Sequence, residues 1–508
     1  MAELELDTLE SKGLIRVAAI QPELEYLFRH ALVQDAAYES LLKQERRSLH
    51  RLVGDALEQL YPERHGELAA VLARHFEQAG EPDKAIEYLL EAARFAYDRN
   101  GLVEAYDLYV RAEALLPPPT ADDSAALRRR RVDIGYGKVR AGFSFLGDDE
   151  SFRQIEPLVH EADRLGDLRL AADIHMHAVL LRMYRGERAE TSPELKQSLD
   201  RVTEIGRQLN DPLIDALPRS IIGLFQVFTG NLREGVETLE QVSPLLAEKH
   251  DFVGSSFALV ALALGLGRMG RFDEAEVAAK RAMEVAESGD VIAKIDALIA
   301  QSGVRSMRGD LEGAVPIARQ CTELAEQSGA TACVVASSFV LGDALMRQGK
   351  FGDARIVFER SGTIADVTEQ RIFRPSITAY LRSSAASLGE FTLAGRTFDE
   401  ALDEARSVHD RWGATHVIWK RADTEAKKAE GERDSEQMLA DYAAAASAFE
   451  EMGARPFEAR VLRDWGEALQ RVGHTAEGDT QLQAAVGLFD ELGLEREAAE
   501  VRAALGTG

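Results

Sequence analysis

The 508-residue sequence is poor in cysteine, in proline and in long apolar runs. It contains 2 cysteines and 14 prolines, too few cysteines for the disulfide framework of a small secreted protein. The most apolar stretch, FALVALALGL at 257–266, is shorter than the roughly 20 residues that span a bilayer, and Arg268 and Arg271 follow it. The N-terminus lacks a basic start followed by an apolar core, so no signal peptide is expected. We therefore expect a cytoplasmic protein with no membrane partner.

Positive charge and catalytic motifs are also scarce. Lys+Arg 60 against Asp+Glu 86 gives a formal net charge of -26. Such an acidic surface repels the phosphates of nucleic acids and of anionic lipids, so no nucleic-acid partner is expected. No phosphate-binding G-x-x-x-x-G-K-[ST] loop occurs, and GFSFLG at 142–147 lacks the G-x-S-x-G spacing. His175 and His177 are two residues apart and make a poor metal pair. We therefore predict that the chain is not an enzyme and holds no cofactor and no metal.

The sequence does contain a six-residue phrase that recurs about every 40 residues. The phrases are GNLREG at Gly230, GRFDEA at Gly270, GDLEGA at Gly309, GKFGDA at Gly349 and GEFTLA at Gly389. Weaker copies begin at Gly431 and Gly473, and a second series of turn signals, such as ESGD at 287–290, falls between the phrases. Two turns per repeat, with apolar periodicity between them, predict two helices per repeat.

Each copy of the phrase has the chemistry of a turn between two packed helices. Its glycine suits the left-handed residue that ends a helix. The aromatic residue or leucine two positions later can hold the turn to the core, and a small residue at the sixth position (Gly395, after Ala394, in the last copy) lets the next helix pack closely. A single hairpin cannot bury its apolar face, so neighbouring hairpins must stack. These features resemble tetratricopeptide-type repeats, and they predict an all-α, tetratricopeptide-like α-solenoid that forms a right-handed superhelix of hairpins.

The predicted organisation has four parts. Residues 1–61 form a partial winged-helix-like segment, and residues 62–116 form the first helical repeats, because GEPDKA and NGLVEA open two helices with close copies of the turn phrase. Residues 117–124, PPPTADDS, are a linker. Residues 125–508 form the repeat array.

The segment that precedes the repeats is predicted to contain two short strands and two helices. LIRVAAI (14–20) and ELEYLF (23–28) are the strands, joined at Gln21-Pro22, and the helices span about 30–43 and 45–61. This segment, with FRHALVQDAAYESLLKQERRSLHRLVGDALE, resembles the end of the winged-helix module in STAND-type signalling ATPases. The ATPase regions attached to bacterial adenylate cyclases and to LuxR-type regulators are the most similar. The resemblance covers residues 5–116.

That family carries its ATPase before the winged helix, and this sequence shows no ATPase motif. The resemblance therefore implies that the chain is the sensor end of such a system, with an ATPase domain as a partner in cis or in trans. In related ATPases a histidine of this module approaches the nucleotide phosphates, and His30, beside Arg29, is the candidate counterpart. The alternative is that His30 caps a helix and Arg29 is solvated.

Two sets of residues are candidates for binding on the concave face. His409, Trp412, His416 and Trp419 follow helical spacing, and this set either lines a groove or packs adjacent hairpins. The second set lies on the inner helices expected near 212–229, 252–269, 291–308, 331–348, 372–388 and 412–430. It comprises Arg268, Arg305, Arg347 and Arg382, with Tyr380 and Trp419 beside them.

Arg268, Arg305 and Arg347 are spaced 37 and 42 residues apart, close to one repeat. Such a series could clamp an acidic peptide or a carboxylate through forked hydrogen bonds. The alternative is that each arginine complements the C-terminus of a helix.

Three functions remain open from the sequence. The leading hypothesis is a non-catalytic scaffold or sensor that binds a protein or peptide within a bacterial signalling ATPase system. The second is a sensor of a small effector that lodges in the superhelix. The third is a fragment of a larger ATPase–cyclase or transcriptional regulator whose catalytic part lies elsewhere.

Overall fold

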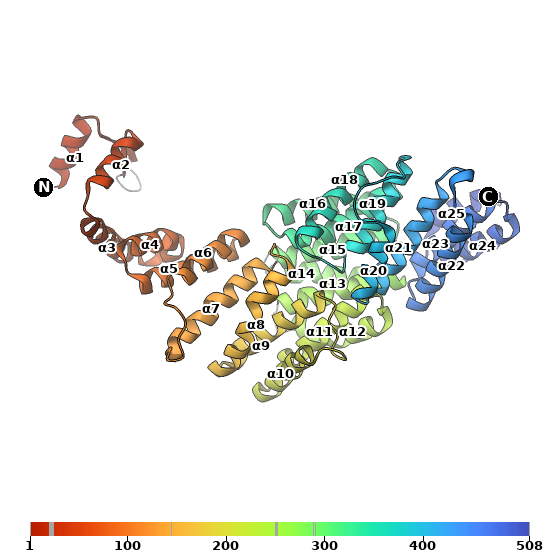
Figure 1. The fold of residues 1–508 in the computed structure, drawn as a ribbon, viewed down its shortest axis with the longest axis horizontal. Coiled ribbons are helices and arrows are strands. Elements are labelled where there is room, and N and C mark those ends of the chain that lie inside the picture. Colours follow the sequence, from red (N-terminus) through yellow and green to blue (C-terminus); the bar gives the residue numbers. More distant parts are fainter. Residues whose placement is uncertain are drawn as a thin grey trace. The chain divides into compact units, whose positions relative to one another are not determined.

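The structure is a computed structural model that describes residues 2–19, 25–143, 145–248, 252–287, 289 and 291–506. These residues are mostly helical (Figure 1). They divide into two compact units. The first consists of Met1–Ala96 and Asp107–Pro119, and the second consists of Tyr97–Tyr106 and Thr120–Gly508.

The first unit begins with a helix and a short β-hairpin. Strand β1 (Ile15–Ala19) pairs antiparallel with β2 (Glu25–Phe28), with Ile15 opposite Phe28. The predicted turn at Gln21-Pro22 lies outside the described residues. The helices that begin in this unit are α1 (Ala2–Ser11), α2 (Ala31–Ser40), α3 (Lys43–Leu60), α4 (His65–Ala79) and α5 (Pro82–Asp98). Helix α6 (Leu102–Ala114) is divided between the two units.

Helices α2 and α3 leave apolar side chains exposed to solvent. Helix α2 has no buried residue, and in α3 only Gly54 is buried among the described residues. Leu32, Leu42 and Leu52 are each more than half exposed. The described residues of α2 and α3 therefore bury little of their own apolar surface.

The second unit is a tetratricopeptide-like α-solenoid of antiparallel helical hairpins, drawn from orange to blue in Figure 1. The inner helices are α7 (Ala125–Gly142), α9 (Leu168–Tyr184), α11 (Pro212–Thr229), α13 (Phe252–Met269), α15 (Val291–Met307), α17 (Thr331–Arg347), α19 (Arg374–Ser387), α21 (Arg411–Ala426), α23 (Arg455–Arg471) and α25 (Glu495–Ala504). The outer helices are α8 (Asp148–Leu165), α10 (Pro193–Leu209), α12 (Leu232–Glu248), α14 (Phe272–Ala286), α16 (Leu311–Gln327), α18 (Phe351–Val367), α20 (Phe398–Ser407), α22 (Ser435–Met452) and α24 (Thr475–Glu491). The predicted inner helices therefore match observed ones to within a few residues.

The recurring glycines end the inner helices, as predicted. Gly230, Gly270, Gly309, Gly349 and Gly389 all have positive φ, between +74° and +99°. In the Gly270 turn, the Gly270 N–H donates to the Gly267 carbonyl and the Arg271 N–H donates to the Leu266 carbonyl. These bonds satisfy carbonyls that the end of the helix would leave without donors.

The turn after Gly389 differs from the prediction that the next helix begins directly. Helix α20 begins at Phe398, where Thr397 and Glu400 form a capping box. Gly395, which was expected to help two helices pack, has φ +94° inside the intervening loop. Arg382 holds that loop by donating to the carbonyls of Leu393, Gly395 and Arg396.

The superhelix completes a turn and packs on itself with a constant sequence offset. Four glycines next to helix ends show this offset. If a Cβ atom were added to any of them, it would lie close to the side chain of the residue 222 positions later in the sequence. The pairs are Gly147 with Glu369, Gly186 with Val408, Gly230 with Met452 and Gly270 with Leu492. In three of them the left-handed turn after an inner helix meets the C-terminal end of an outer helix. Glycine at these positions therefore allows the left-handed backbone of the hairpin turn. It also leaves room for the close contact, here called the seam, between successive turns of the superhelix.

Candidate functional site: the lumen of the solenoid

Three adjoining cavities lie inside the second unit and are lined mainly by inner helices. The N-terminal cavity has a volume of about 270 Å³, the middle cavity about 160 Å³ and the C-terminal cavity about 340 Å³. The first two share Phe143, Phe257, Ile292 and Asp296, and the last two share Asp343, Tyr380 and Phe457. The cavities therefore form one series along the lumen.

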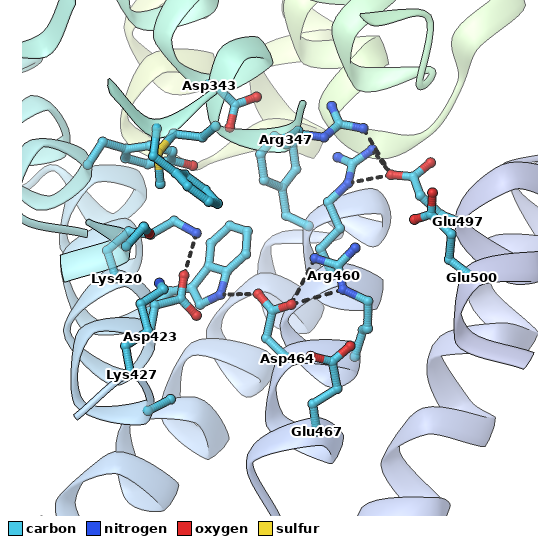
Figure 2. Close-up of a pocket in the computed structure, with 18 of the residues that line it drawn as sticks. Asp343, Arg347, Lys420, Asp423, Lys427, Arg460, Asp464, Glu467, Glu497 and Glu500 are labelled. Atoms are coloured by element: carbon cyan, nitrogen blue, oxygen red, sulfur yellow. Dashed lines mark hydrogen bonds and ion pairs between the residues drawn. The ribbon is translucent and has the colours of Figure 1, made fainter. Parts of the chain in front are cut away.

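The C-terminal cavity contains a buried arginine–glutamate–arginine triad. Arg347 and Arg460 both donate to Oε1 of Glu497, at 2.9 Å each. Figure 2 shows the two guanidinium groups converging on this carboxylate. Arg460 also donates to the carbonyl of Met307, and Arg347 donates to the carbonyl of Ser306. The triad thus joins α15 and α17 to α23 and α25 across the seam.

The charges of this triad compensate one another. The side chains of Arg460 and Glu497 are 4% and 9% exposed. Burial alone would raise the pKa of Glu497, but Arg460 and Arg347 outweigh burial and hold the pKa below its ordinary value. Burial lowers the pKa of Arg347 to about 10. Arg347 and Glu497 therefore both remain charged near neutral pH.

A second network crosses the same cavity. The Lys420 ammonium lies 2.8 Å from Asp423 Oδ2 and 3.4 Å from the centre of the Trp419 ring. The Tyr442 hydroxyl donates to the same Asp423 carboxylate at 2.9 Å. The Trp419 Nε1–H donates to Asp464 at 3.0 Å.

Lys427 and Glu467 also line the C-terminal cavity and stand outside these networks. Within the described part of the chain, the side chains of Lys427 and Glu467 make no hydrogen bond and no ion pair. Burial lowers the pKa of Lys427, and burial followed by Asp464 raises the pKa of Glu467. Both residues are nevertheless exposed, so water can supply their hydrogen bonds.

The middle cavity is mainly apolar and rich in aromatic side chains. Nine of its 25 lining residues are aromatic, whereas aromatic residues make up 7% of the chain. The nine are Phe143, Tyr184, Phe228, Phe257, Phe339, Phe373, Tyr380, Trp412 and Phe457. Its charged residues are Asp148, Asp296, Asp343 and Arg268.

The Arg268 side chain is occupied by contacts within the protein. Its guanidinium donates to the carbonyl of Val227 at 2.7 Å and lies 4.0 Å from the centre of the Trp412 ring. Burial lowers its pKa to about 10. Asp410, the N-cap of α21, lies near it, and burial raises the pKa of Asp410 to about 7 although Gly413 N–H and Arg268 oppose this rise.

Two acceptors of the middle cavity lack donors. Oδ2 of Asp148 and Oε1 of Gln370 are buried, and neither has a hydrogen-bond partner within the described residues. Burial, followed by the nearby Glu369, raises the pKa of Asp148 to about 7. The Asp296 carboxylate accepts a hydrogen bond from Ser256 at 3.2 Å.

The N-terminal cavity is lined by α7, α9, α11, α13 and α15, together with Tyr97. Arg140 stacks over the Tyr97 ring at 4.9 Å, and the Tyr136 hydroxyl lies 3.0 Å from Nδ1 of His177. Burial lowers the pKa of His177 to about 4, so this histidine is neutral at physiological pH. Neither His175 nor His177 faces the other, because His175 bonds Ser198 and Asp163 instead.

The three predicted arginines do not form a series along one groove. Arg268 lines the middle cavity and Arg347 the C-terminal cavity, whereas Arg305 lines none of the three and lies 3.9 Å from Asp310. Arg268 and Arg347 each precede a turn glycine by two residues, but Arg305 precedes its glycine by four. A helix turns about 100° per residue, so Arg305 points elsewhere. Arg268 and Arg347 donate to carbonyls near the C-terminus of the preceding inner helix, as the alternative interpretation stated.

The predicted aromatic set is mostly packed between hairpins. Trp412 and His416 are buried, and their rings contact Phe449 and Phe457. Tyr380 is also buried and lies 3.2 Å from Nδ1 of His416. Trp412 and Tyr380 also line the cavities, whereas His416 lines none of the three.

His409 does not share the helical face proposed for it. It has φ +56° in the turn before α21 and is exposed. It therefore takes the left-handed position that glycine takes in other turns.

Arg29 and His30 lie in the first unit and are exposed to solvent. His30 is the N-cap residue of α2, but its side chain makes no capping hydrogen bond. The side-chain capping role is therefore not observed. The nucleotide contact of His30 stays a prediction.

Sequence reasoning missed Asp148, Gln370, Arg460 and Glu497. Asp148 opens α8 within a run of acidic residues, and Glu497 lies in EREAAE, so both resemble solvated helix positions. Arg460 carried a weak signal, because it lies on an inner helix of the same repeat series as Arg268 and Arg347.

Comparison with known proteins supports the fold. No protein-family model matches the chain. An uncharacterized protein of Rhizobium meliloti (strain 1021) is 26% identical over 158 residues, which are 31% of this chain, and the match spans only 15% of that protein's length. Among solved structures, a Rap protein complexed with competence and sporulation factor is similar at 13% identity and a TM-score of 0.50, over 73% of this chain and 98% of that chain.

A STAND protein with a tetratricopeptide repeat sensor, from Pyrococcus horikoshii, is similar at 14% identity and a TM-score of 0.40, over 91% of this chain and 75% of that chain. The likeness to the Rap protein defines the class of fold, an all-α array of tetratricopeptide-like repeats. Within the described residues, no helix is both long and apolar enough to cross a membrane.

Proposed function

We propose that the second unit is a non-catalytic sensor or scaffold that takes a protein or peptide segment into its lumen. The series of three cavities carries this proposal. Protein interiors are close-packed, and voids larger than a water molecule are few. A repeat array that served only as a spacer would fill its axis with side chains. Open space of 160 to 340 Å³ at three adjoining places favours a ligand site instead.

The lining of the lumen supports an extended ligand. Every inner helix from α7 to α25 contributes to at least one of the three cavities. Charged groups predominate at the C-terminal end and aromatic groups in the middle. A peptide segment, with polar backbone groups and mixed side chains, complements such an alternation better than a uniformly apolar ligand does.

More specifically, we propose that this sensor acts within a signalling ATPase system in the cytoplasm of a bacterium. Its support is the resemblance of residues 5–116 to STAND-type modules. The exposed leucines of α2 and α3, with Arg29 and His30 on the same unit, provide a surface that fits an ATPase domain in cis or in trans. The repeat unit would report ligand binding to that domain.

A small effector is the second candidate ligand, and the size of the middle cavity favours it. An apolar cavity of about 150 Å³ accommodates a benzene-sized ring. The middle cavity, at about 160 Å³, therefore holds one ring with little space to spare.

Random-peptide phage display on the purified full chain tests the proposal. Enriched peptides are synthesised and titrated by calorimetry against the parent chain and against Ala336→Phe, which fills the middle cavity. Ala444→Phe is the matched control, because Ala444 is exposed on the outer helix α22. We expect Ala336→Phe to abolish binding and Ala444→Phe to preserve it. Peptides that bind both variants equally would show that the lumen is not the site.

A further inference from the structure

The middle cavity has an excess of negative charge inside aromatic walls. Its three aspartates occupy different places along the lumen. Asp296 is shared with the N-terminal cavity, Asp343 is shared with the C-terminal cavity, and Asp148 lies between them in the series. Arg268 is the one basic residue among the described lining residues.

Arg268 does not neutralise Asp148 or Asp343. Its guanidinium donates to the Val227 carbonyl and stacks on Trp412, and the carboxylate nearest to its charge is Asp410, which does not line the cavity. Near Asp148, Arg185 is paired with Asp149, and Arg371 is not part of the lining. Asp343 lies near the charge of Arg347, but Arg347 is paired with Glu497. Within the described part of the chain, neither Asp148 nor Asp343 forms an ion pair.

The wall of the middle cavity also contains hydrogen-bond acceptors that have no donor in the described part of the chain. Asp148 Oδ2 and Gln370 Oε1 are buried without a hydrogen-bond partner among the described residues, and Gln370 is only 7% exposed. A buried acceptor without a donor destabilises the folded state by about 1–3 kcal/mol. A ligand that brings N–H groups would satisfy both acceptors.

We propose that the middle cavity binds an organic cation, an ammonium or guanidinium group carried on an aromatic or other apolar body. Asp148 and Asp343 supply the counter-charge, the aromatic rings supply stacking and cation–π contacts, and Asp148 and Gln370 accept the N–H groups. An anionic ligand of the same shape would meet the like charges of Asp148 and Asp343. This inference rests on the proposed function, since it specifies the chemistry of the ligand that the lumen takes.

Two sources provide this chemistry. A lysine or arginine side chain beside an aromatic residue in a peptide is one, and a free aromatic amine is the other. The cavity volume of about 160 Å³ admits a single ring or one long side chain in either case. A peptide extends further into the adjoining cavities, whereas a free amine stays within the middle one.

Calorimetric titration of the full chain at about pH 8 tests the charge requirement. The small probes are phenethylamine, phenethyl alcohol and hydrocinnamate, which share a phenyl ring and differ in charge. The peptide probes are acetyl-Phe-Lys-Phe-amide and acetyl-Phe-Glu-Phe-amide. We expect the affinity of each cationic probe to be at least about tenfold higher than that of its neutral or anionic counterpart. Tighter binding of the lysine peptide than of phenethylamine would assign the ligand to the peptide class, and the reverse order to the free amine.

Three variants place the cation in the cavity. Asp148→Asn and Asp343→Asn should each weaken binding of the cationic probes by about tenfold and leave binding of phenethyl alcohol unchanged. Asp353→Asn is the matched control, because Asp353 is exposed on the outer helix α18, and it should change nothing. Two independent aspartates keep the test decisive if one variant folds poorly.

The proposal is overturned if hydrocinnamate binds as tightly as phenethylamine, or if both cavity variants bind cations like the parent chain. Failure of every cationic probe also overturns it. If display peptides still require an open lumen in that case, the proposed function stands without the cation. If those peptides ignore Ala336→Phe, the proposed function itself fails.

Discussion

The C-terminal and middle cavities share three wall residues, yet they treat buried charge in opposite ways. In the C-terminal cavity most charged groups have partners, as in the triad of Arg347, Arg460 and Glu497. In the middle cavity, Asp148 and Gln370 have buried acceptors that no donor of the described chain reaches. The paired charges of the C-terminal cavity hold the superhelical turns together. The unpaired acceptors of the middle cavity are free to accept hydrogen bonds from a ligand.

This difference separates structure from function in a fold whose helices are otherwise alike. A compensated buried charge contributes to the folded state only while its partners are present. An uncompensated buried polar group destabilises the folded state, and its retention points to a ligand. The predictions below compare the two kinds of site, each against a matched control.

The largest effect is expected at the triad. Glu497→Gln leaves two buried guanidinium groups without their common carboxylate, and we expect a loss of about 3–5 kcal/mol in the free energy of unfolding. Glu500→Gln, on the same helix, removes only an exposed pair with Arg496 and should cost at most about 1 kcal/mol. Urea denaturation followed by circular dichroism measures both. Equal midpoints for the two variants would show that the triad does not hold the seam.

The glycines of the seam provide the next comparison. Gly270→Ala places a methyl group against Leu492 in the next superhelical turn, whereas Gly349→Ala meets open space. Both positions have positive φ, so both variants lose about 1 kcal/mol from backbone strain. The overpacked seam should add about 1–3 kcal/mol for Gly270→Ala. Thermal melting curves of the two variants are the measurement, and superimposable curves would contradict the seam.

The next largest difference in the free energy of unfolding is expected between variants of Arg268 and Arg305, two arginines near the ends of inner helices. Arg268→Met loses the hydrogen bond to Val227 and the stacking on Trp412, and we expect it to lower the free energy of unfolding by about 2 kcal/mol. Arg305→Met should change it by less than about 0.5 kcal/mol, because Arg305 is partly exposed and weakly paired. Urea midpoints of the two variants decide this, and a larger effect at Arg305 would restore the idea of a shared arginine series.

The hairpin register was predictable from the sequence because it depends on local chemistry. A left-handed residue after each inner helix requires glycine, and the apolar period fixes which faces pack, so the predicted limits of α11 to α21 were close. The turn at Gly389 departs from this rule because Gly395 and the capping residue Thr397 delay α20 to Phe398.

The seam and most of the candidate site were not predictable in this way. The offset of 222 residues is the sum of small rotations between hairpins, which no local pattern records. Arg268, Arg347, Tyr380 and Trp419 do line the cavities, but their partners across the seam, such as Glu497, resemble ordinary surface charges in the sequence. The binding roles of these residues remain predictions.

The most direct test of the account compares the stability of the parent chain and of Asp148→Asn at about pH 5 and about pH 8. Burial and Glu369, with Asp149, raise the pKa of Asp148 to about 7, against the opposing effects of Arg371 and Arg185. The folded state therefore holds a proton that the unfolded state has lost, and the stability from this group falls as pH rises from about 4 through about 7. Asp410 titrates in the same range in both proteins, so their difference isolates Asp148.

We predict that Asp148→Asn and the parent chain unfold at similar urea concentrations at about pH 5. At about pH 8, the variant should be more stable than the parent by roughly 1–2 kcal/mol, because it no longer buries an uncompensated carboxylate. A variant less stable than the parent at both pH values would mean that Asp148 is a compensated structural group, and the contrast between the two cavities would be wrong.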